Sequence, residues 1–238
     1  MDQVEALDRR DVDVCFYGED PYPPRLAQIS GAPGLLFMWG NPDLLHTPSV
    51  GMCGSRHASP KGLEAALTCG LEVAAHGLTI VSGYAKGVDT ETHLAALRSG
   101  GRTIIVLAEG ISHFRVKRSF RDVGLRRDHV LVLSQFPPAQ RWNVGAAMTR
   151  NRVISGLGRA LVVIEAGETG GTLNAGFQAL EMGRPVLALE FSEGTPTGNE
   201  ILFDKGAVRI DRRSALGKAL VSFEDPTVEW PTRQPSLL

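Results

Sequence analysis

Residues 160–183 read ALVVIEAGETGGTLNAGFQALEMG, and this segment contains the main signals of an α/β fold. It begins with a continuous apolar run at 160–165, which is typical of a strand buried on both faces of a parallel sheet. A loop of small residues follows, and 172–182 is predicted to be a helix with Thr172 as its N-cap and Gly183 after its end. Such a loop at a helix N-terminus offers backbone N–H groups to a phosphate.

Similar apolar runs recur from residue 49 onward, and helical stretches separate them. The runs occupy 49–53, 78–82, 103–108, 129–134 and 185–190. The helical pattern is clear at 60–76, where one stripe contains Leu63, Ala66, Leu67, Gly70 and Leu71. Strands that alternate with helices predict an α/β fold with a doubly wound, mostly parallel sheet.

The chain before residue 49 has a different character, because turn residues dominate it. One short apolar run at 35–39 is interpreted as a strand or as a plug against the core. We therefore expect a single domain in three parts: an N-terminal extension packed on the core (1–48), the doubly wound domain (49–211), and a C-terminal part (212–238). The last part should hold a short helix at 214–221 and a loosely attached tail from 225.

Composition bounds the function classes. With 43% hydrophobic and 21% charged residues in 238, the chain can build a core and is not disordered. The 25 Lys and Arg residues balance 26 Asp and Glu, which excludes a polycation that coats DNA. No apolar run could span a membrane, and no secretory signal is visible. Three cysteines without metal-ligand spacing favour a reducing compartment, so we expect a cytoplasmic protein with no membrane partner.

Candidate ligand-binding residues follow the predicted strands, where open α/β sheets bind ligands. Gly54, Ser55 and Arg56 follow the first strand, and the guanidinium of Arg56 can bind a phosphate with two hydrogen bonds. A tight turn with a surface arginine would give the same sequence pattern. The second strand leads into Ser82, Gly83, Lys86 and Gly87, a plausible anion pocket. Asp89 is predicted to cap the next helix there, and His93 is interpreted as structural rather than as a metal ligand.

A third group precedes an apolar helix. Arg150, Asn151 and Arg152 stand at its start, where anion contact is favoured over a solvated helix end. With the glycine loop Gly170-Gly171-Thr172 they complete the predicted site. We expect Arg56, Arg150 and Arg152 to converge on one anion.

One stretch of the chain, residues 115–127, is strongly basic. It contains a single acid, Asp122, beside Arg115, Lys117, Arg118, Arg121, Arg126 and Arg127. A solvated helix face and an anion-binding role are equally compatible with it. We predict that it lies on the rim of the pocket, where Lys117, Arg118 and Arg121 would extend a basic track for a nucleic-acid backbone.

Several enzyme signatures are missing. The sequence has no G-x-x-x-x-G-K-[ST] phosphate loop, no H-E-x-x-H zinc motif, no Cys/His cluster and no G-x-S-x-G elbow. Only Glu165 and Glu168 lie near the glycine loop as acids or bases, and caps or turns suit them better. We expect no catalytic residue, no metal and no cofactor.

In this order and spacing, the motifs at 54–56, 82–89, 150–154 and 170–172 resemble the DNA-processing protein A family (DprA, also called Smf). The resemblance covers about residues 16–210. It implies an extended Rossmann-like fold and a non-enzymatic protein that binds single-stranded DNA, protects it and helps to load RecA in recombination and natural transformation. By motif position, the pocket would use Arg56, Lys86, Arg150 and Arg152. We also expect a homodimer.

The chain departs from the family pattern in several places. Lys86 stands where the family usually has arginine, which loses bidentate geometry. The aromatic residue that commonly precedes the Arg-Asn-Arg motif is missing from 144–148, and Trp142 is a candidate substitute for stacking on a base. We expect a short, divergent, stand-alone member.

Gly170-Gly171-Thr172 is also similar to the loop of the LOG-type nucleotide phosphoribohydrolases. Ala175 stands where their catalytic glutamate would be, and their proline is missing, which argues against that activity. Three interpretations stay open: a single-stranded DNA-binding protein, which we favour, a sensor that binds a small nucleotide in the same pocket, and a hydrolase using Glu165 or Glu168.

Overall fold

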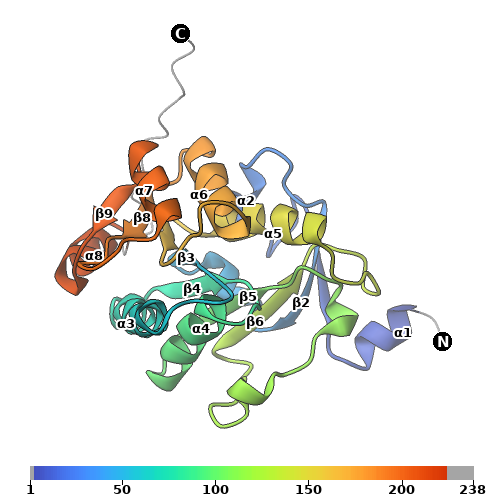
Figure 1. Cartoon of the computed structure of the whole chain (residues 1–238). Coiled ribbons are helices and arrows are strands. Elements are labelled where there is room, and N and C mark those ends of the chain that lie inside the picture. The colour runs from blue at the N-terminus through green and yellow to red at the C-terminus, as the bar shows by residue number, and fades with distance from the viewer. Residues whose placement is uncertain (1–2, 224–238) are drawn as a thin grey trace.

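In a computed structural model that describes residues 3–223, one nine-stranded sheet runs through the molecule in the order β1-β2-β6-β5-β4-β3-β7-β8-β9 (Figure 1). The neighbours from β6 across to β9 all pair in parallel. Their bounds are β3 (Ser49–Cys53), β4 (Thr79–Ser82), β5 (Thr103–Val106), β6 (Val130–Ser134), β7 (Leu161–Val163), β8 (Val186–Leu189) and β9 (Val208–Ile210). Every residue of β3 to β8 is buried, which is why their sequences are continuous apolar runs. The six predicted strands are confirmed.

Helices cover both faces of this sheet, as the predicted doubly wound fold requires (Figure 1). One core lies under α3 (Pro60–Ala75) and α8 (Arg213–Val221), with α4 (Val88–Arg98) beside α3. The other core lies under α5 (Val144–Leu157), α6 (Gly171–Glu181), α7 (Thr197–Asp204) and the short α2 (Pro24–Ala27). The fold class is confirmed, and so is the short helix predicted at 214–221.

The centre of the sheet holds a topological switch point. Strands β3 and β7 are neighbours, yet β3 leads into α3 and β7 leads into α6, which pack on opposite faces. The loops after the two strands therefore diverge and leave a crevice at their carboxyl ends. In open α/β sheets this is the place where ligands bind.

The N-terminal segment extends the same sheet. Strand β2 (Leu35–Gly40) pairs antiparallel with β6, and β1 (Asp13–Phe16) pairs antiparallel with β2. The remaining elements are α1 (Gln3–Asp8) and the 3-10 turns η1 (Pro42–His46), η2 (Ile111–His113) and η3 (Arg118–Phe120). The run at 35–39 is thus a strand. The expected boundary at residue 48 falls inside one sheet, so this segment is part of the sheet rather than an addition packed on it.

Two helices begin at a glycine rather than at the predicted cap. Gly170 (φ 108°) precedes α6 and Gly87 (φ 74°) precedes α4, so Thr172 and Asp89 lie inside first turns. The prediction was wrong because a glycine enters the positive-φ region that other residues avoid and lets the loop turn sharply into the helix. The Asp89 carboxylate instead accepts a hydrogen bond from the Ala85 N–H (3.2 Å).

Two further expectations concern the C-terminal tail and the absence of a membrane-spanning segment. The predicted tail from residue 225 lies outside the described residues. Among residues 3–223, no helix is both long enough and apolar enough to cross a bilayer.

Candidate nucleic-acid interface

Two adjoining hollows open at the carboxyl ends of the parallel strands. The first hollow, about 420 Å³, lies at the switch point between the loop after β3, the loop after β7 and helix α5. The second hollow, about 530 Å³, lies between the loops after β3, β4 and β5. Both are lined by Arg56, Ala85, Trp142 and Arg150, so they form one groove with a shared middle.

The two hollows differ in chemistry. The first combines apolar side chains with small polar residues; its lining includes Cys53, Ala147, Met148, Ile154, Ser55, Asn151, Gly171 and Thr172. The second is cationic, since Lys86, Arg115 and Lys117 join the shared arginines and Glu109 is its one acidic lining residue. A partly apolar hollow, whose lining also includes Asp89, beside a cationic one suits a ligand that has both a flat ring and phosphates.

Arg56 and Trp142 stack on each other in the shared middle of the groove. The guanidinium carbon of Arg56 lies 5.3 Å from the centre of the Trp142 ring, and 45% of Trp142 is exposed. A cation over one ring face is a favourable contact that also fixes the arginine near the groove. Trp142 therefore lies where a base could stack, as its proposed role as a substitute aromatic requires.

Arg150 is the buried cation of the groove, with only 6% of its surface exposed. Its Nη1 donates to the carbonyl of Val106 at the end of β5 (2.8 Å), while its Nε has no hydrogen-bond partner among residues 3–223. Burial lowers the pKa of the Arg150 guanidinium, and the nearby Asp89 carboxylate opposes that shift. Arg150 is thus a fixed, desolvated charge whose Nε–H is unpaired among the described residues.

Three predicted glycines serve the packing of loops rather than the approach of a ligand. A Cβ on Gly83 would lie 1.8 Å from Arg150 Nη1, one on Gly54 would lie 2.5 Å from Val88, and one on Gly87 would lie 2.4 Å from the Ser55 carbonyl oxygen. Gly170 and Gly171 differ, because nothing lies within 4 Å of the former and only Met148 Sδ, at 3.9 Å, near the latter. Only this last loop keeps an open glycine face.

The structure separates the predicted arginines. Arg56 and Arg150 line the groove together, but Arg152 lines neither hollow and donates instead to the Ser30 carbonyl (2.5 Å). The expected convergence of all three is wrong because residues two apart on a helix point about 200° apart. Asn151 does reach the first hollow and donates to the Gly171 carbonyl (3.3 Å).

The two predicted serines have structural partners. Ser55 lines the first hollow, but its Oγ accepts a hydrogen bond from the His57 N–H (3.0 Å) and so shapes the turn. Ser82 is fully buried in β4, lines neither hollow, and donates to the Met52 carbonyl (2.7 Å).

The basic stretch, residues 115–127, does not lie on one rim. Arg115 and Lys117 line the second hollow, and Lys117 lies over the Tyr84 ring with its Nζ 4.0 Å from the ring centre. Its Nζ also donates to the Tyr84 carbonyl (2.5 Å), and burial lowers the pKa of this ammonium. Arg118 and Arg121 are exposed and line neither hollow.

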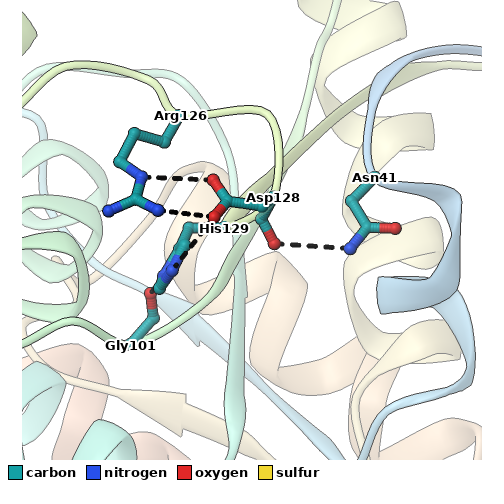
Figure 2. Close-up of polar contacts among 5 residues, drawn as sticks. All are labelled: Asn41, Gly101, Arg126, Asp128 and His129. Atoms are coloured by element: carbon teal, nitrogen blue, oxygen red, sulfur yellow. Dashed lines mark hydrogen bonds and ion pairs between the residues drawn. The ribbon is translucent and has the colours of Figure 1, made fainter.

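The C-terminal end of this stretch lies at the amino ends of the parallel strands, away from the groove. Figure 2 shows Arg126 donating to both carboxylate oxygens of Asp128 (3.2 and 2.6 Å), beside His129 and Gly101, which precede β6 and β5. Arg127 pairs with Asp11 (2.9 Å). A connection between parallel strands must run from a carboxyl end back to an amino end, so only its first part can border the groove.

The comparison with known proteins follows the same motifs. A family model described as DNA recombination-mediator protein A matches residues 13–220. The chain belongs to this family. DNA processing protein DprA of Streptococcus pneumoniae is 41% identical over 194 residues, covering 79% of this chain and 67% of that protein. DprA of Bacillus subtilis is 33% identical over 216 residues, covering 89% and 69%.

Solved structures agree with this membership of the recombination-mediator protein A family. The S. pneumoniae DprA structure has a TM-score of 0.81 at 34% identity and covers 94% of this chain and 79% of that one. The Helicobacter pylori DNA processing protein A, described with a single-stranded DNA binding mode, has a TM-score of 0.77 at 22% identity, covers 88% and 95%, and shows the fold. The resemblance to the DprA/Smf family and its extended Rossmann-like fold is confirmed.

The two glutamates left open as catalytic candidates do not line the groove of this family member. The Glu165 carboxylate accepts hydrogen bonds from the Ser59 N–H (3.1 Å) and from its hydroxyl (2.7 Å) at the start of α3. Glu168 is exposed on the loop after β7. Neither side chain lines the first or the second hollow.

Some groove residues were missed from the sequence. His57, Tyr84 and His113 line the second hollow, and each lies in the loop region that follows a parallel strand. Considering every side chain in these loops, rather than those beside glycines, would have found them. Met148 was missed because its apolar character indicates core packing.

His93 supports the groove from beneath, as its structural interpretation requires. It is fully buried; its Nε2 donates to the Gly83 carbonyl (2.6 Å) and its Nδ1 lies 2.6 Å from Thr103 Oγ1. Burial lowers the pKa of His93 to about 4, although the bond to Gly83 acts in the other direction. The ring is therefore neutral in the folded protein near neutral pH.

This shift predicts a pH dependence of stability. The unfolded chain takes up the His93 proton near pH 6.5 and the folded chain only near pH 4, so the contribution is complete above pH 6.5 and is lost as pH falls through 4. We expect the free energy of unfolding to fall by up to about 3 kcal/mol over that range. Denaturant titrations at a series of pH values should show that the free energy of unfolding of His93→Gln depends less on pH. The exposed control His57→Gln should keep the pH dependence of the parent.

Proposed function

We propose that this protein binds single-stranded DNA along the groove and performs no chemistry on it. The observation that carries the proposal is the shared middle, where Arg56 and the buried Arg150 face both an apolar hollow and a cationic one. The names of the relatives and the single-stranded DNA described for the H. pylori protein support it. Such a groove needs no net positive charge on the whole chain.

The chemistry of the two hollows suggests how a strand would lie. A base enters the first hollow against its apolar side chains, with Trp142 as a stacking surface. The phosphates on either side contact Arg56 and Arg150, and the backbone continues past Lys86, Arg115 and Lys117. Phosphate contacts of this kind are independent of base sequence.

A sensor for a small nucleotide is the second candidate. The first hollow, at about 420 Å³, falls within the range of small-molecule sites, and Gly170 and Gly171 leave an open backbone face at the start of α6. This alternative uses the first hollow alone, whereas the DNA proposal needs both.

Competition binding distinguishes the two candidates. A labelled single-stranded oligonucleotide should bind, and mononucleotides should displace it only at far higher concentration. The affinity should fall with salt, with a slope of about 0.7 for each phosphate neutralised. Displacement by mononucleotides at equal concentration would favour the sensor.

The proposed path of the strand makes a prediction for the basic track. Arg118 and Arg121 follow Lys117 in the chain but line neither hollow. Their double substitution by glutamate should weaken oligonucleotide binding several-fold by repulsion of a strand that extends beyond the second hollow, while mononucleotide binding stays unchanged. Arg126→Glu is the control, because Arg126 lies near the amino ends of the parallel strands, away from the groove. Equal loss for both ligands, or for neither, would argue against an extended track.

Absence of turnover is a separate prediction. Hydrolysis needs an acid, base or metal within hydrogen-bond reach of the reacting atom. The Asp89 carboxylate lines the first hollow but accepts a hydrogen bond from the Ala85 N–H (3.2 Å), and Glu165 lines neither hollow and accepts from the Ser59 hydroxyl. We expect no release of base or phosphate from nucleoside monophosphates, with or without magnesium. Turnover that Glu165→Gln or Glu168→Gln abolishes would move the protein to the hydrolases. Glu165→Gln should otherwise cost only about 1 kcal/mol of stability, seen by denaturation.

The finer parts of the family role belong to the same proposal: protection of the strand, assistance to RecA in the cytoplasm, and a homodimer. Nuclease protection of a bound oligonucleotide tests the first. Loading of RecA onto coated DNA tests the second, and sedimentation equilibrium tests the third.

A further inference from the structure

Strand β1 is the outermost strand of the sheet, and its free edge is set up for hydrogen bonding. The Tyr17 N–H donates to the Gly34 carbonyl (2.9 Å), which marks this as a hydrogen-bonded pair of the β1–β2 ladder. Such pairs alternate along an antiparallel ladder, so Val14 and Phe16 direct their backbone groups away from β2. The Phe16 carbonyl accepts from the Glu19 N–H (3.1 Å), which leaves both groups of Val14 and the N–H of Phe16 for a further strand.

The side chains of the same two residues form a partly exposed apolar surface. Val14 is 41% and Phe16 is 50% exposed. They lie opposite Phe37 and Leu35 on the face of the sheet whose core contains Phe37. Leu7 of α1 and Val12 also pack on this core, yet Val14 and Phe16 stay 41% and 50% exposed, so the apolar face continues onto β1 only partly covered by the described residues. Natural edge strands are commonly protected by lysine, proline or a bulge, and the sequence of β1, DVCF, has neither lysine nor proline.

The segment that contains β1 is acidic, although Arg9, Arg10 and Arg25 flank it. Residues 11–24 contain Asp11, Asp13, Glu19 and Asp20 and no lysine or arginine. Asp11 pairs with Arg127, whereas no ion pair is formed by Asp13, Glu19 or Asp20 within residues 3–223. A second copy of the same edge would place like charges together, which disfavours self-pairing.

We propose that β1 is a docking edge for an extended basic segment of another protein, which adds a strand beside Val14 and Phe16. Main-chain hydrogen bonds would supply part of the affinity. Apolar residues at alternate positions would cover Val14 and Phe16, and lysine or arginine between them would meet the acidic rim. This edge lies on a different strand from the groove and needs no nucleic acid.

A labelled peptide in which lysine alternates with valine is the probe, measured by fluorescence anisotropy with the full chain. Val14→Pro removes an outward N–H without touching the β1–β2 ladder, and should weaken peptide binding about tenfold. The double substitution Asp13→Lys with Glu19→Lys should reverse the preference toward a matched glutamate–valine peptide. Val221→Lys, which replaces another exposed valine (56%) on α8, is the control and should bind as the parent does.

Two results would overturn the proposal. One is peptide binding that neither Val14→Pro nor the charge reversal changes, provided that thermal melting shows both variants folded. The other is self-association of the parent chain that Val14→Pro abolishes, because the edge would then serve a second copy. Loss of oligonucleotide binding in the Val14→Pro variant would also contradict the separation of the edge from the groove.

Discussion

Replacing Arg56 with alanine should lower the affinity for a single-stranded oligonucleotide by about ten- to a hundredfold. Arg56 is the one exposed guanidinium that lines both hollows, and it lies over Trp142. A charge-assisted hydrogen bond contributes about 1.5–3 kcal/mol, and loss of the contact also frees the Trp142 ring. The salt dependence of binding should decrease by the amount of one phosphate contact. Fluorescence anisotropy over a series of salt concentrations measures both effects.

Arg152→Ala is the matched control for this prediction. The sequence motif assigns Arg152 the same role as Arg56, whereas the structure has it bonded to Ser30 and away from the groove. We expect its affinity to change less than about twofold. Equal losses for the two variants would mean that the groove is not the binding surface.

Replacing Gly87 with alanine should lower the free energy of unfolding by about 3 kcal/mol or more. Gly87 has φ +74°, and its added Cβ would lie 2.4 Å from the Ser55 carbonyl oxygen and 2.9 Å from that of Arg56. Both atoms belong to the backbone and cannot rotate away, so the two loops must separate. Denaturant unfolding should show a lower midpoint. Oligonucleotide affinity should fall as well, because Arg56 moves with its loop.

Gly77→Ala isolates the contribution of the contact. Gly77 has φ +67°, close to that of Gly87, but nothing lies within 4 Å of its added Cβ. The backbone strain alone costs about 1–2 kcal/mol, and we expect no change in binding. If both variants lost the same free energy of unfolding, contact between the two loops would not be the cause.

The parallel strands were predictable because burial on both faces leaves one signal, a continuous apolar run. Strand β1 gives no such signal, since Cys15 alone is buried in its four residues. Its position depends on pairing with β2, whose own partner β6 lies far along the chain. The glycine caps of α4 and α6 were missed because sequence shows a favoured capping side chain, but not a backbone angle.

The site was predictable to the extent that strand ends define it. Arg56 was found because it follows a strand at the carboxyl edge of the sheet. Arg150 was found from the Arg-Asn-Arg motif, which was predicted at the start of a helix but lies inside α5. Arg152 was assigned wrongly because it is close to Arg150 in the sequence motif, whereas residues two apart on a helix point to different sides. The prediction for the basic stretch was only partly right, because the connection from β5 to β6 runs back along the sheet and places Arg126 and Arg127 away from the groove.

The antiparallel pairing of β2 with β6 has a consequence for synthesis. Phe37 leaves the ribosome long before its partner Ser134, so β1 and β2 have no sheet to join while the first parallel strands emerge. Contacts between residues so distant in sequence form slowly, and their strands stay open to other partners in the meantime. The hairpin made first is therefore among the last parts of the sheet to be completed, and a nascent chain halted before residue 130 should leave it open to proteases.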